Sequence, residues 1–326
     1  MDLQKLSYHL RNEGFIVDLS KIDENGKWNI VALDDNSVGK KSGSFKIVNN
    51  ICIYHNFKTG ITKTYNDNTI LKRDEYIQLK KDIFKNQQKI NQQKFLKSKE
   101  AFIEFQNIEI GGSSEYLNNK KVKNFGCKID KNGNLIVPFR NDKGYITTYQ
   151  TIYPNGNKIF KKEAEVKGSS HAIGFNKIFF APEKYFGKIF ITEGYATGAS
   201  VHMATNQPTI IAANAGNLLP VLDRFKKKYH NAEFIICADW DLKLIELDKN
   251  KYIWNNTGVD KAIECQNIYK TQVVVPEFSK ISSDLRPKMS DFNDIHCFIG
   301  LEEITNQLQC QINNKIKVKS ELCQGR

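Results

Sequence analysis

The sequence predicts an α/β fold in which the second half of the chain forms a parallel sheet with helices on its faces. Two observations support this prediction: short apolar runs alternate with helical segments from residue 188 onwards, and acidic residues follow several of the runs. Such alternation is typical of βαβ units, whose strands are parallel. The expected strands are 188–192, 209–213, 233–238 and 271–275, and the expected helices lie near 196–206, 218–230 and 257–270.

The first half of the chain is expected to contain three further segments. Residues 1–65 predict a small β-rich module, because apolar runs such as Gly43–Val48 alternate with Gly, Asn and Asp turns. Residues 66–105 contain no Gly or Pro and predict a solvated helical linker. Residues 106–187 return to short strands, near 134–140, 145–150 and 158–162, which are joined by hairpin turns. A helix and a basic tail are expected over 298–326.

Composition restricts the class of protein. With 326 residues, more than one domain is expected, and a net charge of +12 favours a polyanionic partner, nucleic acid before a membrane surface. No long apolar stretch or N-terminal signal region is found, so we expect a cytoplasmic protein that does not enter a membrane. Seven cysteines are scattered without a C-x-x-C pair, which favours reduced thiols over disulfides or zinc.

Carboxylates follow three of the apolar runs. They are Glu193 after 188–192, Asp239 and Asp241 after 233–238, and Asp291 and Asp294 after the last run. In an extended chain residues i and i+2 point the same way, so Asp239 and Asp241 should project together. Close carboxylates repel each other unless a cation or proton intervenes, and Mg²⁺ prefers oxygen ligands. The pattern predicts a Mg²⁺ or Mn²⁺ site in the crevice outside the carboxyl ends of the strands. The alternative is a set of solvated turns at the strand ends.

The dipeptide Glu193-Gly194 has a further possible role. Gly194 permits a tight turn between strand and helix and leaves room for a phosphate or a nucleic-acid strand. Glu193 would then face the crevice as a general base or an additional metal ligand. The alternative is an acid that simply complements the dipole of the following helix.

These residues carry a family resemblance. The motifs are Glu193-Gly-Tyr-Ala-Thr-Gly, Cys237-Ala-Asp-Trp-Asp and Asp291-Phe-Asn-Asp, and they resemble the Toprim domain of topoisomerases, primases and related nucleases. Two more segments, Ala213-Asn-Ala-Gly-Asn-Leu and Asn256-Thr-Gly-Val-Asp-Lys-Ala, are similar to primases of plasmids, phages and integrated mobile elements. The resemblance implies a Rossmann-like Toprim domain at 188–297, with Glu193, Asp239 and Asp241 as catalytic residues. It also implies an α+β primase polymerase subdomain at 106–187.

The same resemblance implies contacts with nucleotide and template. Primases of this kind place one lysine of a K-x-F/Y element and one of a Lys-Gly turn toward the nucleotide and the template, and Lys158 and Lys167 match these positions. Arg140, Gly194 and Asn217 are further candidates. Ammonium groups opposite a metal can hold a triphosphate and a template backbone. The alternative for either lysine is an exposed position in a hairpin.

Two features depart from the resemblance. Primases of this kind often carry an N-terminal zinc module, but residues 1–65 do not supply a set of four zinc ligands, so Cys52 is expected in a core. This segment resembles instead a metal-free β module of some mobile-element primase-helicases. The residues of this module that could hold single-stranded DNA by charge and stacking are Trp28, Lys40, Lys41, Phe57 and Lys58. The sequence also lacks G-x-x-x-x-G-K-[ST], so any helicase partner is expected to be a separate protein.

The leading hypothesis is a DNA primase that makes short RNA primers on single-stranded DNA from ribonucleoside triphosphates by metal-dependent nucleotidyl transfer. A Toprim nuclease is the alternative enzyme, because the same acids could activate water. A non-catalytic protein that binds single-stranded DNA is the third hypothesis. A topoisomerase is disfavoured, since no tyrosine can be assigned to a separate strand-transfer domain.

Overall fold

The computed structural model describes residues 1–24, 26–33, 42–48, 51–57, 61–66, 73–176, 178, 180–248 and 251–314. The chain divides into two compact units, one of residues 1–90 with 244–253 and one of residues 91–243 with 254–326. The second unit holds every residue of the predicted site. Within the described residues, no helix combines the length and apolar character needed to span a membrane.

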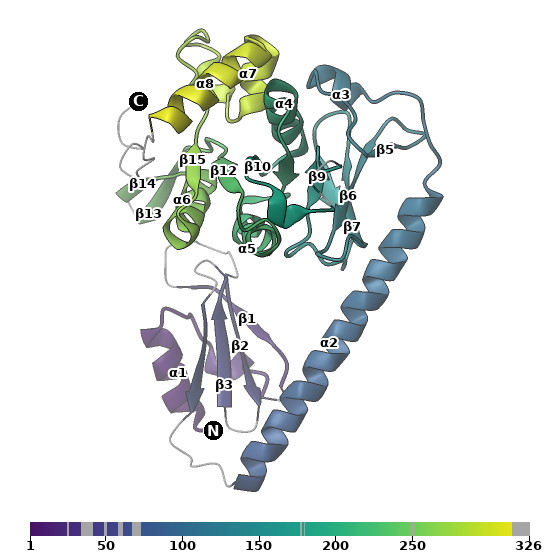
Figure 1. Ribbon diagram of the computed structural model, residues 1–326. Helices are drawn as coiled ribbons and strands as arrows, with labels where there is room; N and C mark the ends of the chain where they lie inside the picture. The colour runs from purple at the N-terminus through teal and green to yellow at the C-terminus, as the bar shows by residue number, and fades with distance from the viewer. Residues whose placement is uncertain are drawn as a thin grey trace. The chain divides into compact units, whose positions relative to one another are not determined.

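The first unit contains a four-stranded antiparallel sheet in the order β1-β2-β3-β4 (Figure 1). Its strands are β1 (Asn29–Val31), β2 (Gly43–Val48), β3 (Ile51–Asn56) and β4 (Thr62–Asn66), and helix α1 (Leu3–Asn12) packs against them. Alternation along β2 and β3 buries Phe45, Cys52 and Tyr54 in one core with Leu6 and Leu10. The β-rich character and the core position of Cys52 agree with the prediction, whereas α1 and β4 were not predicted. A two-stranded hairpin, β13 (Lys243–Asp248) and β14 (Lys251–Asn255), was not predicted either.

Helix α2 (Arg73–Asn107) corresponds to the predicted linker, since it contains no helix breaker. Its last turns are anchored in the second unit, where Phe105 packs with Ile136 and Ile146. The Lys128 ammonium donates to the carbonyls of Phe105 and Gln106, at 2.8 Å each, and so satisfies free acceptors at the helix C-terminus.

A four-stranded antiparallel sheet begins the second unit, in the order β5-β6-β7-β8. Its strands are β5 (Lys128–Ile129), β6 (Leu135–Arg140), β7 (Ile146–Ile152) and β8 (Lys158–Phe160), and the short helix α3 (Glu115–Asn119) packs on the same core. The last three strands agree with the predicted hairpins.

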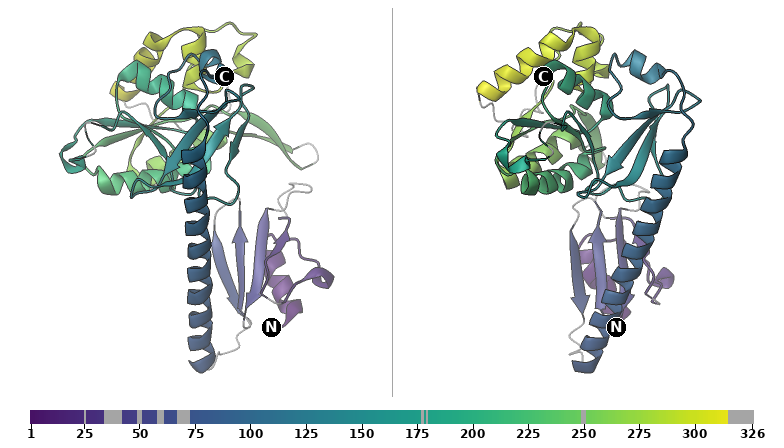
Figure 2. Two further views of the ribbon diagram at one scale, coloured as in Figure 1. Left: turned by 90° about the vertical axis from the view of Figure 1, so that its right-hand side faces the viewer. Right: turned by 45° about the vertical axis from the view of Figure 1, so that its right-hand side comes forward.

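The main sheet of the second unit has five strands in the order β15-β12-β10-β11-β9 (Figures 1 and 2). The strands β10 (Lys188–Thr192), β11 (Thr209–Ile211), β12 (Glu233–Cys237) and β15 (Gln272–Val274) are parallel, as predicted. The fifth, β9 (His171–Ile173), is antiparallel to β11 and comes from the segment predicted as the polymerase subdomain. The main sheet therefore begins upstream of the predicted boundary at residue 188.

Helices cover both faces of this sheet. On one face lie α5 (Leu218–Lys228) and α6 (Thr257–Tyr269), and their Val221, Leu222 and Ala262 pack against the strands. On the other face lie α4 (Tyr195–Thr205), α7 (Phe292–Phe298) and α8 (Leu301–Asn313), as Figure 2 shows. Because both faces are covered, the strands are continuous apolar runs rather than alternating ones.

Candidate active site

The acids after β10 and β12 meet at one edge of the main sheet. These two strands are parallel neighbours, with Ile191 opposite Ile236, so their carboxyl ends lie side by side. Glu193 follows β10, and Asp239 and Asp241 follow β12. The charge of Asp241 acts on Glu193, and the charges of Glu193 and Asp241 act on Asp239. The structure therefore places the three acids predicted to be catalytic at one edge of the sheet, where their charges act on one another.

One oxygen atom on each of two of these carboxylates is buried without a partner. Glu193 is only 8% exposed, and its Oε1 atom and the Oδ1 atom of Asp239 have no hydrogen-bond partner among the residues that the structure describes. The pKa of Glu193 is raised to about 7, mainly by burial and to a smaller extent by the charge of Asp241. A hydrogen bond from the Ala215 amide acts in the opposite direction and lowers this pKa. Burial, followed by the charges of Asp291 and Glu193, raises the pKa of Asp239 well above its usual range. Such groups are costly unless a proton or cation compensates them.

The acid pair at the start of α7 divides between two tasks. Asp291 and Asp294 form a capping box, in which the Asp294 amide donates to Asp291 Oδ1 at 3.0 Å. Asp294 Oδ2 accepts from the Ser290 amide at 2.7 Å and so orders the loop. Asp291 accepts from the Thr197 hydroxyl at 2.9 Å, and its charge is the largest one acting on Asp239. Asp291 therefore lies beside the strand-end acids, whereas Asp294 holds the backbone.

The donor set fits a divalent cation. Among the described residues, no three His, Cys, Asp or Glu side chains already converge as metal ligands. Carboxylates that repel one another are not expected to converge without a cation. The unpartnered oxygens of Glu193 and Asp239, with Asp241 and Asp291 beside them, are hard oxygen atoms of the kind that Mg²⁺ and Mn²⁺ take as ligands.

The four acids Glu193, Asp239, Asp241 and Asp291, called the acidic cluster below, should make the metal-free protein less stable at alkaline than at acidic pH. The folded pKa of Glu193 is about 7 against an ordinary value of 4.5, so the folded state holds more protons between these values and stability falls as pH rises through this window. We expect Glu193→Gln to raise the free energy of unfolding in EDTA by on the order of 2 kcal/mol at pH 8 and by little at pH 4.5. Urea unfolding at both pH values measures this. Glu233→Gln, an exposed site at the other end of the sheet, is the control, and equal effects of the two variants would contradict the prediction.

Lys158 lies opposite the acids. A Cβ atom placed on Gly194 would be 3.4 Å from the Lys158 ammonium nitrogen, which puts this side chain at the start of α4. The positive charge of Lys158 partly opposes the rise in the pKa values of Glu193 and Asp239. The structure thus places Lys158 and Gly194 beside the acids, and the role of Lys158 toward a nucleotide remains a prediction.

On the primase hypothesis, Lys158→Gln should weaken use of a nucleoside triphosphate more than it weakens folding. Loss of one charge-assisted contact to a triphosphate corresponds to about 2 kcal/mol, or about 30-fold in kcat/KM. Steady-state kinetics with varied triphosphate measures this. Lys162→Gln, an exposed lysine in the segment after β8, is the matched control. Equal kinetic effects of the two variants would show that Lys158 acts only through the general charge of this surface.

Lys167 occupies an exposed turn that Asn217 supports. Gly168, at φ +75°, adopts the left-handed conformation that favours glycine, and its amide donates to Asn217 Oδ1 at 2.7 Å. Asn217 Nδ2 donates to the carbonyls of Ser169 at 2.9 Å and Ala212 at 2.7 Å, and Asn217 is 3% exposed. The Asn217 amide, predicted to contact nucleotide or template, therefore has its hydrogen-bonding groups engaged within the protein. It positions the Lys167 turn against the end of β11.

Replacing Asn217 with Ala should destabilise the protein. The Gly168 amide and the carbonyls of Ser169 and Ala212 would lose their partner, at a cost of about 1–3 kcal/mol. Urea unfolding should show a lower midpoint with an unchanged slope. Asn214→Ala, an exposed residue of the same motif, should have little effect. An unaltered midpoint for Asn217→Ala would mean that the turn is held by other contacts.

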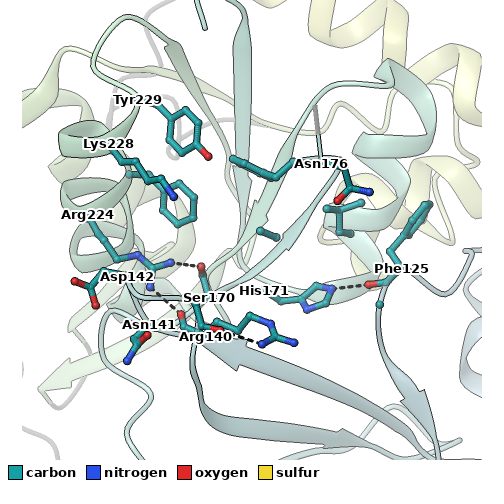
Figure 3. Close-up of a pocket in the computed structure, with 17 residues that line it drawn as sticks. Phe125, Arg140, Asn141, Asp142, Ser170, His171, Asn176, Arg224, Lys228 and Tyr229 are labelled. Atoms are coloured by element: carbon teal, nitrogen blue, oxygen red, sulfur yellow. Dashed lines mark hydrogen bonds between the residues drawn. The ribbon is translucent and has the colours of Figure 1, made fainter. Parts of the chain in front are cut away.

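Arg140 lies at a different place from Lys158. It ends β6, where its guanidinium donates to the Gly144 carbonyl at 3.0 Å, and its own carbonyl accepts from Arg224 at 2.8 Å. Both arginines line a pocket whose lining, within the described residues, includes none of the acids named above (Figure 3). The predicted cations thus separate into Lys158 at the acids, Lys167 on its turn and Arg140 at this pocket.

The sequence analysis included Asn256 and Gly258 in a motif but did not assign them a role beside Asp241 and Glu193. Asn256 Oδ1 accepts from the amides of Asp241 at 3.1 Å and Val259 at 3.4 Å, and so joins the acidic loop to the start of α6. A Cβ atom on Gly258 would lie 2.5 Å from the Asp239 carbonyl oxygen and 2.9 Å from Glu193 Oε1. The Asn-Thr-Gly sequence before a helical segment is a recognisable N-cap pattern, but its contact with the acids depends on the fold.

The fold and the site together define an α/β protein with an acidic cluster at the carboxyl edge of a parallel sheet. No protein-family model matches the chain. Two curated proteins of Escherichia coli, each called DNA primase TraC, are similar to it: they are 28% and 27% identical over 175 residues, which is 53% of this chain. The chain covers only 11% and 16% of the length of these relatives. The expected resemblance to primases is confirmed by this similarity in sequence.

Solved structures of primases also match the chain, at a low level. The primase fragment of the bacteriophage T7 primase-helicase protein matches with a TM-score of 0.38 and 14% identity, covering 60% of this chain and 69% of that one. The Aquifex aeolicus primase, with its zinc-binding and RNA polymerase domains, matches with a TM-score of 0.37 and 12% identity over 93% of this chain and 82% of that one.

Proposed function

We propose that this chain is a DNA primase, which synthesises short RNA primers on single-stranded DNA from ribonucleoside triphosphates. The observation that carries the proposal is the pair of buried, unpartnered carboxylate oxygens of Glu193 and Asp239 with the Lys158 ammonium opposite them. Similarity to proteins named DNA primase supports the choice among enzymes that use such a site. On this proposal, residues 188–297 form a Toprim domain and residues 106–187 a polymerase subdomain that contributes Lys158 and Lys167.

The acids would hold Mg²⁺ or Mn²⁺. Glu193, Asp239, Asp241 and Asp291 are the proposed ligands, and Asp294, predicted as a further ligand, is proposed instead to hold the loop. The bound ion would neutralise the triphosphate and stabilise in-line attack by a 3′-hydroxyl with release of pyrophosphate. Lys158 would orient the triphosphate, and Asn217 and Asn256 would keep the Lys167 turn and Asp241 in place.

The first unit is proposed to bind the template. Trp28 is 47% exposed with the Lys46 ammonium 4.8 Å from its ring centroid, and Phe57 is 52% exposed. Exposed aromatic rings beside cations suit stacking on single-stranded bases. Lys40, Lys41 and Lys58, predicted to contribute, lie outside the described residues. A separate replicative helicase is the proposed partner.

The experiment that tests the proposed function follows both the DNA template and the newly made RNA. A 5′-labelled single-stranded DNA is incubated with the protein and Mg²⁺ or Mn²⁺, with and without four ribonucleotides carrying a second label. A primase leaves the template intact and makes short labelled RNA only when nucleotides are present. Shortening of the template without nucleotides would establish the alternative nuclease. Binding without either product would favour the non-catalytic protein.

A further inference from the structure

A second basic site lies in the same unit as the acids. Helix α5, strand β9 and the end of β6 enclose a pocket of about 440 Å³, shown in Figure 3. This volume lies within the range of small-molecule sites in proteins, which is about 300–1,000 Å³. Since none of the acidic-cluster residues lines it, the pocket is a separate feature of the described chain.

Three cations from two elements line one part of the pocket: Arg224 and Lys228 from α5, and Arg140 from β6. The Arg224 guanidinium donates to the Arg140 carbonyl at 2.8 Å and to the Ser170 hydroxyl, and the Arg140 guanidinium donates to the Gly144 carbonyl at 3.0 Å. These partners are neutral. Burial lowers the pKa of Arg224 to about 10, so it stays charged at neutral pH.

One acidic side chain of the pocket, Asp142, acts on Arg224 without forming an ion pair with it. Asp142 lines the wall, and its charge acts on Arg224, yet no ion pair within 4.0 Å joins either arginine to a carboxylate in the part of the chain that the structure describes. A partly buried guanidinium with only neutral partners favours an anion, and its planar donors match a phosphate.

Aromatic rings form another part of the pocket lining. Phe175 is in edge-to-face contact with Phe225 and Tyr229, at ring-centroid distances of 5.6 and 5.5 Å, and both phenylalanines are largely buried. Asn176 lies across the pocket from Arg224 (Figure 3), and its amide can both donate and accept a hydrogen bond. His171 also lines the pocket, and its two ring nitrogens lie within hydrogen-bond distance of the carbonyls of Pro138 and Phe125.

Cations on one side and aromatic rings with an amide on the other match the two halves of a nucleotide. We propose that this pocket binds a nucleotide, with its phosphate at Arg140, Arg224 and Lys228 and its base toward Phe175 and Asn176. The bound unit is either a free nucleotide or one nucleotide of a single strand, since both present a phosphate and a base. The proposal does not depend on catalysis at the acids.

Binding without a divalent metal tests it. In EDTA the acidic cluster holds no metal and repels a triphosphate, so the metal-dependent site contributes little to binding of a fluorescent ATP analogue. The difference in binding between a pocket variant and the wild type then reports the pocket. We expect Arg224→Gln and Lys228→Gln each to raise the dissociation constant about tenfold, the effect of one lost charge-assisted contact. Lys227→Gln is the matched control, because Lys227 lies on the same helix, is paired with Asp223 at 2.7 Å and does not line the pocket. This variant should bind as the wild type does.

A fluorescent oligodeoxythymidylate distinguishes the two sources. If the pocket takes one nucleotide of a strand, the Arg224 and Lys228 variants also weaken binding of the oligonucleotide. The salt dependence of this binding then falls by about one ion for each charge removed. If it takes a free nucleotide, only binding of the ATP analogue weakens. Absence of saturable binding of either probe, or equal effects of the Lys227 and Lys228 variants, would overturn the proposal.

Two controls keep the outcomes separate. Lys228→Gln leaves the hydrogen bonds of Arg224 in place, so it tests the pocket even if Arg224→Gln lowers stability. Primer synthesis measured on the same preparations reports the acids, and therefore loss of one activity without the other identifies which site has failed.

Discussion

Asp239→Asn is expected to reduce primer synthesis about 10²- to 10³-fold while leaving template binding unchanged. Asp239 is buried beside the charges of Asp291 and Glu193, and its Oδ1 has no hydrogen-bond partner among the described residues. The amide would therefore remove charge where a cation is proposed to bind. The measurement compares the rate of primer synthesis with the anisotropy of a labelled template.

The same variant should be more stable than the wild type when metal is absent. Removing a carboxylate that is repelled by its neighbours relieves a cost that the fold otherwise bears. Glu233→Gln, at the exposed start of the same strand, is the control for both measurements. An Asp239→Asn protein that keeps its activity, or that loses template binding in parallel, would contradict the assigned role.

Gly258→Ala is expected to abolish most activity through geometry rather than charge. The added Cβ atom would be 2.5 Å from the Asp239 carbonyl oxygen, so the start of α6 or the acidic loop must move. A displacement of about 1 Å at reacting groups can cost about 10²-fold in rate, and overpacking costs about 1–3 kcal/mol of stability.

Rates of primer synthesis and urea unfolding, measured together, check this expectation. Gly112→Ala is the matched control, because nothing lies within 4 Å of a Cβ atom at that position. Normal activity of Gly258→Ala would mean that the acidic loop adapts to the added methyl group without disturbing catalysis.

Local pattern was sufficient for much of the fold. The parallel strands β10, β11, β12 and β15 were predicted because both faces of the sheet are covered, which leaves uninterrupted apolar runs. Strand β9 was missed because His171–Ile173 has only three residues and gains its place by pairing with β11. The hairpin of β13 and β14 follows the acidic loop directly, where no turn pattern separated it from that loop.

In the candidate site too, local sequence pattern predicted some positions but not the contacts made by residues distant in the chain. Strand-end position was enough to predict that Glu193, Asp239 and Asp241 meet, since parallel neighbours share one carboxyl edge. Sequence did not distinguish Asp291 from Asp294, because that depends on which oxygen caps α7. Gly258 and Arg224 act through contacts with residues distant in the chain, Glu193 and Arg140, and such contacts leave no local pattern.

On the proposed function this chain copies a DNA template into RNA, and the choice of incorporated base is the most direct test. The measurement is incorporation of each labelled ribonucleotide, with Mg²⁺ or Mn²⁺, on single-stranded templates that differ at one base. We predict that the incorporated nucleotide changes to the complement of the altered base and that Asp239→Asn incorporates little of any nucleotide. Incorporation that ignores the template base, or no incorporation by a folded protein that binds the template, would contradict the account.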